Sequence, residues 1–323
     1  MPATGENDIH VLDEPATYSD AVASSSDEEI TNTKAIDIKS DIKTVCASKK
    51  LATFESLPSK KNHEEFIKTC KLFDFKVKDT PSTHDDLIKV LKETIQYSVK
   101  TGHPYFVNQL FSSLDPYGLV GQWLTDALNP SVYTYEVSPV FTLMEETVLK
   151  EMRKIVGFKD GLGDGIFCPG GSMSNGYAIN CARHKFIPDF KTKGLHSLPR
   201  LVLFTSEDAH YSVKKMASFL GIGSDNVYLI KTNSRGRMDV GHLIKEVERS
   251  LSEGGAPFMV SATAGTTVIG AFDPLEEIAN VCEKYSLWLH VDAAWGGGAL
   301  VSKKTQRIAC RNRKVGFSEK FCQ

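Results

Sequence analysis

The sequence predicts an α/β fold with a mainly parallel sheet flanked by helices. From Pro199 onward, short apolar runs alternate with amphipathic patterns of helical period. Each apolar run is followed by a polar loop, and strands separated by helices form right-handed crossovers and a parallel sheet. The loops that follow the strands should therefore gather at one edge of the sheet.

The composition is that of a soluble globular protein. The 323 residues are 41% hydrophobic and 24% charged, with a formal net charge of −2. This charge gives no reason to expect nucleic acid or an anionic membrane as a partner. The seven cysteines are scattered and contain no C-x-x-C, which favours a reducing compartment over a disulfide framework or zinc site. With no secretory or mitochondrial signal pattern and no apolar run of membrane-spanning length, we expect a cytoplasmic protein.

The N-terminal half divides into two regions by composition. Residues 1–60 contain an acidic serine cluster and few aromatic residues, which predicts a disordered or loosely attached tail. Residues 61–160 form a helical segment, with apolar residues at spacings of three and four. Its expected helices cover residues 84–100, 117–128 and 137–156, and Asn129-Pro130 separates the last two. We assign 161–302 to the main α/β domain.

Residues 164–178, DGIFCPGGSMSNGYA, predict a turn that opens a helix. A short strand-like piece at 165–167 precedes the turn, and the helix extends to about Lys185. The hydroxyls of Ser172 and Ser174 are ordinary for a helix start. The same geometry also suits an anion, because free backbone N–H groups, the helix dipole and nearby glycines favour a phosphate. Both interpretations stay open on these residues alone.

The alternating C-terminal half places polar side chains after its strands. We expect the strands at 201–204, 227–230, 258–261 and 287–291, and the helices between them at 211–220, 240–251 and 274–285. His210 lies in the first of the following loops and Thr263 in the third. An imidazole at this edge can stack on a flat ring or lie on the surface, and the threonine can contact a ligand or close a turn.

The strand 287–291 delivers one carboxylate, Asp292, followed by small residues that include Ala294. In open α/β sheets, ligands bind beyond the carboxyl ends of the strands. An acid there suits a ligand with a protonated group, although it also suits a turn cap. Pyridoxal phosphate matches the whole set, because it has a phosphate for a helix start, a flat ring to stack and a ring nitrogen that needs a carboxylate.

Several segments resemble the group II pyridoxal-phosphate decarboxylases of fold type I, and the resemblance covers about Leu87 to Ser302. Within this family the sequence is most similar to enzymes of cysteine sulfinate and other acidic amino acids, and glutamate decarboxylases are more distant. The segments that carry the resemblance are YSVKTGHP at 97–104, FVNQL at 106–110, YTYEVSPVF at 133–141, PGGSMSN at 169–175, GTTVIGAFDP at 265–274 and HVDAAWGG at 290–297.

The resemblance implies roles for individual residues. The phosphate cradle would comprise Gly171, Ser172, Ser174 and Asn175. His210 would stack on the cofactor ring, Thr263 would contact the cofactor, Asp292 would pair with the pyridine nitrogen and Ala294 would pack against the ring. Gln109 would reach the carboxylate side of the substrate. The implied substrates are cysteine sulfinate, aspartate or glutamate, decarboxylated to hypotaurine, β-alanine or 4-aminobutyrate by a homodimer.

The basic stretch 303–323 departs from the family pattern as we interpret it. The family's Schiff-base lysine lies in a His-Lys pair beyond the aspartate, and we find no such pair there. The sequence therefore predicts a large domain that is incomplete at the C-terminus, with no catalytic lysine and no activity of its own. The alternative is a non-catalytic isoform that pairs with a full-length subunit.

Overall fold

The computed structural model describes residues 77, 79–108, 110–112, 114–195, 198–302 and 304. The predicted tail of residues 1–60 and nearly all of 303–323 lie outside these residues. The chain divides into two compact units, one ending at Val120 and the other beginning at Gly121. Among the described helices, none combines the length and the apolar character that a membrane crossing requires.

The first unit contains helix α3, His84–Tyr97, which confirms the helix expected at 84–100. Thr83 begins it with a capping box: the Thr83 hydroxyl accepts the N–H of Asp86, and the Asp86 carboxylate accepts the N–H of Thr83. Helix α4, Pro116–Leu128, crosses the boundary between the units. It ends where predicted, because Asn129 takes a left-handed backbone (φ 44°) before Pro130.

Helix α5, Pro139–Val156, belongs to the second unit and confirms the amphipathic helix expected at 137–156. Pro139 occupies its first turn, where a missing N–H costs nothing, and Gly157 ends it in the left-handed conformation. No residue of α5 is buried. The apolar stripe predicted from its sequence therefore stays exposed within this unit.

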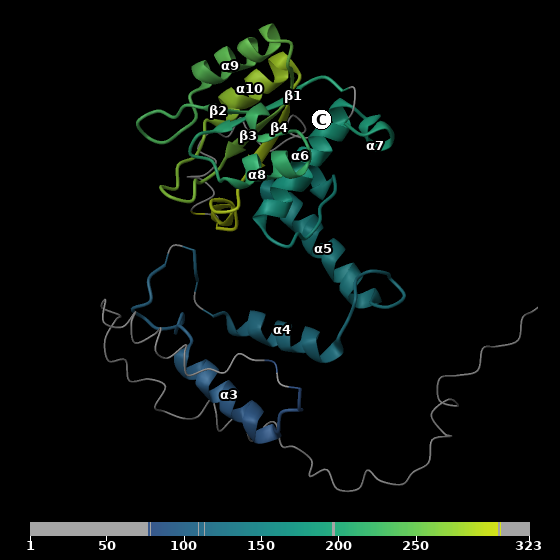
Figure 1. The fold of residues 1–323 in the computed structure, drawn as a ribbon, viewed down its shortest axis with the longest axis vertical. Helices are drawn as coiled ribbons and strands as arrows, with labels where there is room; N and C mark the ends of the chain where they lie inside the picture. Colours follow the sequence, from purple (N-terminus) through teal and green to yellow (C-terminus); the bar gives the residue numbers. More distant parts are fainter. Residues whose placement is uncertain are drawn as a thin grey trace, which may run out of the picture. The chain divides into compact units, whose positions relative to one another are not determined.

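A four-stranded parallel sheet forms the centre of the second unit, in the order β2-β1-β3-β4, with helices on both faces (Figure 1). This confirms the predicted fold class. The strands are β1 Leu201–Ser206, β2 Val227–Ile230, β3 Ala256–Thr263 and β4 Trp288–Asp292. The long helices packed around them are α6 Gly171–Phe186, α8 Ser212–Phe219, α9 Val240–Ser252 and α10 Leu275–Tyr285. Short helical turns not expected from the sequence are η2 Lys159–Gly161, α7 Phe190–Lys193, η3 Ser224–Asn226 and η4 Gly297–Leu300.

The expected strand-like piece at 165–167 is wrong, because the structure forms no strand there. Ile166 and Phe167 are 55% and 57% exposed. A strand is stabilised by pairing with a neighbour, and none of the strands that the structure describes runs beside this piece.

The two faces of the sheet have separate apolar cores. Alternate residues of each strand point to opposite faces. Phe204 and Val260 lie in the core covered by α9 and α10, whereas Leu203 and Met259 lie in the core covered by α6 and α8. A register shift between Val202 and Leu203 opposite β3 lets two consecutive β3 residues enter the second core.

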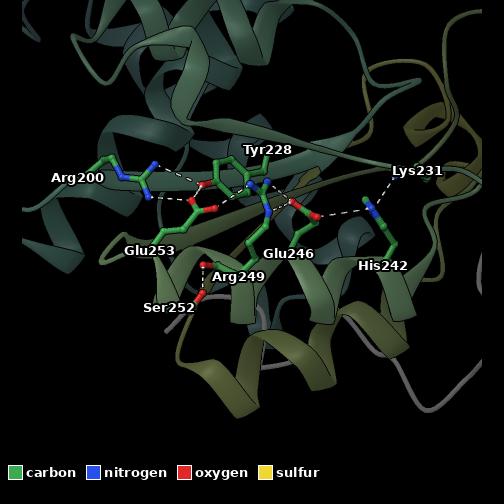
Figure 2. Close-up of polar contacts among 8 residues, drawn as sticks. All are labelled: Arg200, Tyr228, Lys231, His242, Glu246, Arg249, Ser252 and Glu253. Carbon is green, nitrogen blue, oxygen red and sulfur yellow. Dashed lines mark hydrogen bonds and ion pairs between the residues drawn. The ribbon is translucent and has the colours of Figure 1, made fainter.

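Charged side chains from α9 and its neighbours surround Tyr228 of the edge strand β2 (Figure 2). The Arg249 guanidinium lies 4.3 Å from the centre of the Tyr228 ring, and the Tyr228 hydroxyl donates to Glu253 over 2.7 Å. This bond lowers the pKa of Glu253, and Arg200 pairs with the same carboxylate at 3.3 Å.

Candidate functional site

The predicted site residues of the sheet come together at the carboxyl ends of three strands. Thr263 of β3 and Asp292 of β4 are direct register partners, so their side chains lie on the same face. This is the face that α6 and α8 cover. His210 follows β1 and lies two residues before Ser212, the first residue of α8. The topology therefore brings these three residues to one edge, as the sequence predicts.

The first turn of α6 lies against the loop after β4. A Cβ atom built on Gly171 would be 3.9 Å from the Cβ of Ala294, so the glycine turn and Ala294 are in contact. In the part of the chain that the structure describes, the Gly171 and Ser172 amides have no hydrogen-bond acceptor. The next two amides, of Met173 and Ser174, donate to the Gly170 carbonyl. Two free N–H groups at the positive end of a helix therefore lie close to Ala294.

Asn175 contacts other polar side chains instead of the predicted phosphate site. Its Nδ2 atom lies 2.9 Å from Asp292 Oδ2 and 2.8 Å from Ser212 Oγ, and its Oδ1 atom lies 2.8 Å from His290 Nε2. Both N–H groups of the amide are engaged, and the side chain is 3% exposed. The structure thus assigns Asn175 to the carboxylate side of the site, and the backbone of the turn remains for an anion.

His210 is held by the residue two positions further along. Its Nδ1 atom lies 2.8 Å from Ser212 Oγ and 3.2 Å from the Ser212 backbone nitrogen. The ring centre lies 4.2 Å from that of Tyr211, with 36° between the two planes. His210 is half-buried, so its ring is partly accessible.

Two participants in this network, His290 and Ser212, were missed by the sequence analysis. His290 precedes Asp292 by two residues in β4, and this spacing places both side chains on one face. Burial lowers the pKa of His290, and the nearby Asp292 charge partly opposes this. The HxD spacing could have revealed His290, whereas no sequence signal pointed to Ser212.

Thr263 is fixed by a buried carboxylate from the loop after β3. Its N–H donates to Asp273 Oδ2 over 2.8 Å, and the Met238 N–H donates to Asp273 Oδ1 over the same distance. Burial raises the pKa of Asp273, although both backbone bonds favour the ionised form. Asp273 therefore anchors Thr263 in place beside Asp292.

Other parts of the chain fill the space beside the glycines near Asp292. The Ala264 carbonyl and the Phe272 ring fill the space beside Gly296, so no side chain fits there. A Cβ on Gly265 would meet the Gly296 nitrogen at 2.9 Å. These glycines thus let the loops after β3 and β4 interlock.

The donor set fits pyridoxal phosphate. The two free amides of the α6 turn suit a phosphate, Asp292 supplies a negative acceptor for a protonated ring nitrogen, and His210 supplies a flat imidazole. The described residues contain no group of His, Cys, Asp and Glu side chains arranged to hold a metal ion. Gln109 lies outside the described residues, so its predicted role stays a prediction.

The parallel sheet and the site at its carboxyl edge define a fold type I, pyridoxal-phosphate-dependent protein. Residues 67–321 match the pyridoxal-dependent decarboxylase conserved domain. The chain therefore belongs to the pyridoxal-dependent decarboxylase family, whose cofactor is pyridoxal phosphate. The match extends beyond Ser302 into the basic stretch.

Curated relatives support this family. The acidic amino acid decarboxylase GADL1 of Xenopus tropicalis is 58% identical over 237 residues, which are 73% of this chain and 46% of that protein. Human cysteine sulfinic acid decarboxylase is 53% identical over 238 residues, 74% of this chain and 48% of the relative. The chain thus spans about half the length of the curated relatives it matches.

Solved structures agree with the fold. The crystal structure of mouse CSAD has 50% sequence identity and a TM-score of 0.73, covering 76% of this chain and 52% of that one. The glutamate decarboxylase domain of a Vibrio parahaemolyticus protein has 26% identity and a TM-score of 0.69, covering 84% of this chain and 59% of that one.

Proposed function

We propose that residues 161–302 bind pyridoxal phosphate at the carboxyl edge of the sheet. The Gly171 and Ser172 amides hold the phosphate, Asp292 accepts a hydrogen bond from the ring nitrogen, and His210 stacks on the ring. One observation carries the proposal. The Asn175 amide, in the first turns of α6, lies 2.9 Å from the Asp292 carboxylate. The start of α6 and Asp292 are therefore close enough for one small ligand to contact both.

The cofactor, when bound, supplies an electron sink for cleavage of the bond to the substrate's α-carboxylate. The residues of this chain supply placement and charge. Asp292 keeps the ring nitrogen protonated, because a nearby negative charge favours the cationic form. Thr263 and Ala294 border the ring, and the interlocked loops after β3 and β4 hold these side chains in position.

We also propose that the reaction is the α-decarboxylation of a small acidic amino acid. The names of the relatives, acidic amino acid decarboxylase and cysteine sulfinic acid decarboxylase, support this substrate class. The predicted contact of Gln109 with the substrate carboxylate is part of the proposal. We also propose that the protein forms a homodimer and is located in the cytoplasm.

The cofactor proposal is tested by titrating the purified chain with pyridoxal phosphate and following tryptophan fluorescence, since Trp295 lies in the loop after β4. Asp292→Asn should weaken binding by about tenfold or more, because a hydrogen bond to a charged group contributes roughly 1.5–3 kcal/mol. Asp225→Asn, at an exposed turn, is the matched control and should bind like the wild type. Equal affinities for Asp292→Asn and the wild type would refute the role of Asp292.

We further propose that the described residues hold the cofactor without a covalent link and do not decarboxylate by themselves. In the described part of the chain, no lysine hydrogen-bonds to Asp292, Asn175 or His210. Borohydride reduction of the chain with pyridoxal phosphate, followed by peptide mapping, tests this. A labelled lysine together with release of carbon dioxide from cysteine sulfinate would refute it.

A second candidate function is non-catalytic pairing with a full-length subunit of the family. The exposed apolar stripe of α5 favours it, since Leu143, Met144 and Val148 are 52%, 55% and 47% exposed. Co-expression with a full-length decarboxylase tests the idea. The two chains should co-purify, and Met144→Lys with Val148→Lys should abolish this, whereas Lys150→Ala on the same helix should not. Failure of the wild-type chain to co-purify would exclude pairing.

A further inference from the structure

We propose that Asn175 is a positioning residue whose amide fixes both the ionised Asp292 and the tautomer of His210. It rests on the proposed function, in which these two groups face the cofactor ring. Asn175 contacts Asp292 of β4 and, through Ser212 of α8, His210 of the preceding loop. A single buried amide therefore connects the partner of the ring nitrogen with the ring-stacking imidazole.

The first arm of the network sets the orientation of the amide. An ionised carboxylate can only accept hydrogen bonds. Asp292 Oδ1 accepts the Ala294 N–H over 3.0 Å, and Oδ2 accepts from Asn175 Nδ2. The amide must therefore present its NH₂ group to Asp292 and its oxygen to His290. Because that oxygen can only accept, His290 Nε2 carries a proton. Burial lowers the pKa of His290, which favours the neutral ring with its only proton on Nε2.

The second arm of the network links the orientation of the Asn175 amide to His210. The remaining N–H of Asn175 donates to Ser212 Oγ, so the hydroxyl proton is free to donate to His210 Nδ1. The Ser212 backbone N–H, which can only donate, also points at Nδ1 over 3.2 Å. This backbone N–H requires an acceptor at Nδ1, so the Ser212 hydroxyl also donates to that atom. His210 therefore carries its proton on Nε2.

Burial makes this arrangement selective. Ser212 is 0% exposed and Asn175 is 3% exposed, so no water replaces a lost partner at low cost. A reversed amide would place its oxygen against the Asp292 carboxylate and its NH₂ group against the protonated Nε2 of His290. The chain thus presents an oriented acceptor and an oriented imidazole before any cofactor arrives, which is the preorganisation that electrostatic catalysis requires.

The tautomers are tested on the full chain without cofactor by long-range ¹H–¹⁵N correlation spectra of its nine histidines. The signals are assigned by their loss in His210→Gln and His290→Gln. Wild-type His210 and His290 should both be Nε2–H tautomers at neutral pH. Ser212→Ala should shift His210 toward a tautomer mixture and leave His290 unchanged, whereas Asn175→Leu should alter both. A wild-type His210 protonated at Nδ1, or no change at His210 in either variant, would overturn the proposal.

Cofactor affinity gives a second readout. Asn175→Leu should weaken pyridoxal phosphate binding by about tenfold or more, since Asp292 loses a charge-assisted bond. Asn180→Leu is the matched control, because Asn180 also lies on α6 and its amide oxygen bonds to Arg183. It should change neither the affinity nor the two tautomers.

If Asn175→Leu does not fold, Asn175→Asp preserves the shape but places a carboxylate against Asp292, and it should cause at least the same loss. Wild-type affinity in both folded Asn175 variants would overturn the proposal. If the wild-type chain binds no pyridoxal phosphate, the proposed function fails, and the tautomer spectra still decide the inference by themselves.

Discussion

The two faces of the central sheet are built from the same four strands, yet they differ at their carboxyl ends. In β3 and β4, the face covered by α9 and α10 stays apolar to the carboxyl ends of the strands, with Ala262 of β3 and Val291 of β4. The face covered by α6 and α8 begins apolar and becomes polar, with Ser261, His290 and Asp292 in the same region. The first face stabilises the fold, and the second positions the site.

This difference follows from the period of two along a strand. In β4, WLHVD, the residues that point to the α6–α8 face are Trp288, His290 and Asp292, and Leu289 and Val291 point the other way. Stability and chemistry are therefore assigned to alternate residues of one strand. Variants of the two sets should separate the two properties.

The largest expected effect is on stability and comes from the apolar face. Phe204→Ala should lower the free energy of unfolding by roughly 3–5 kcal/mol, because Phe204 is fully buried and leaves a cavity. Denaturant unfolding measures the loss, and Phe219→Ala, at a 74% exposed position of α8, is the control. Folded Phe204→Ala should bind pyridoxal phosphate with wild-type affinity. A large loss of affinity would mean that the two faces do not act separately.

Asp273 bears on this comparison, because its buried carboxylate accepts the N–H of Met238, in the α9–α10 core, and the N–H of Thr263, beside Asp292. Asp273→Asn should destabilise the protein by roughly 1–3 kcal/mol. An amide has one acceptor oxygen, so its NH₂ group would face the N–H of either Met238 or Thr263. Thermal unfolding beside the exposed control Asp189→Asn measures the effect. An unchanged stability would show that the two backbone bonds contribute little.

The polar face should also make stability depend on pH. Burial lowers the pKa of His290 in the folded chain, so the unfolded chain binds a proton first as the pH falls below about 6.5. Stability should therefore decrease on acidification through this window, by at most about 1.4 kcal/mol per pH unit. His290→Gln should flatten the slope in denaturant unfolding between neutral and mildly acidic pH. An equal slope in the variant would assign the dependence to other groups.

The smallest expected effect concerns thiol reactivity on the two sides. Burial raises the pKa of Cys282 of α10 to about 12, whereas Cys181 of α6 is exposed. Iodoacetamide should modify Cys181 in the folded chain and Cys282 only after unfolding, since the thiolate is the reactive species. Peptide mapping by mass spectrometry distinguishes the two. Rapid modification of Cys282 under native conditions would show that the α9–α10 face opens readily.

Sequence reasoning predicted the elements that have a clear apolar period. The expected strand at 227–230 matches β2, and the expected helix at 240–251 ends one residue before α9 does. It was wrong at 165–167, because two apolar residues beside a glycine resemble a strand even where no neighbouring strand exists. Local composition cannot show whether a partner strand is present.

At the site, residues that end a strand were predictable and residues that connect them were not. Asp292 and Thr263 follow from the rule that ligands bind at strand ends. The link from Asn175 to Asp292 joins residues 117 positions apart, and that from Asn175 to Ser212 joins residues 37 apart. Such contacts depend on how α6 packs across the sheet. The sequence therefore placed Asn175 in the correct region with a different partner.

The interlock of the loops after β3 and β4 has a consequence for sequence variation. A Cβ on Gly265 would lie 2.9 Å from the Gly296 nitrogen, and one on Gly296 would overlap the Ala264 carbonyl oxygen. Gly270 has a positive φ of 65°, and a Cβ there would lie 3.1 Å from the Trp295 ring. A saturation screen of this region should find these three positions as intolerant as Asp292, although none of them carries a functional group. Intolerance to substitution at these glycines would reflect the close packing of two backbone segments, and it would not indicate a catalytic or binding role.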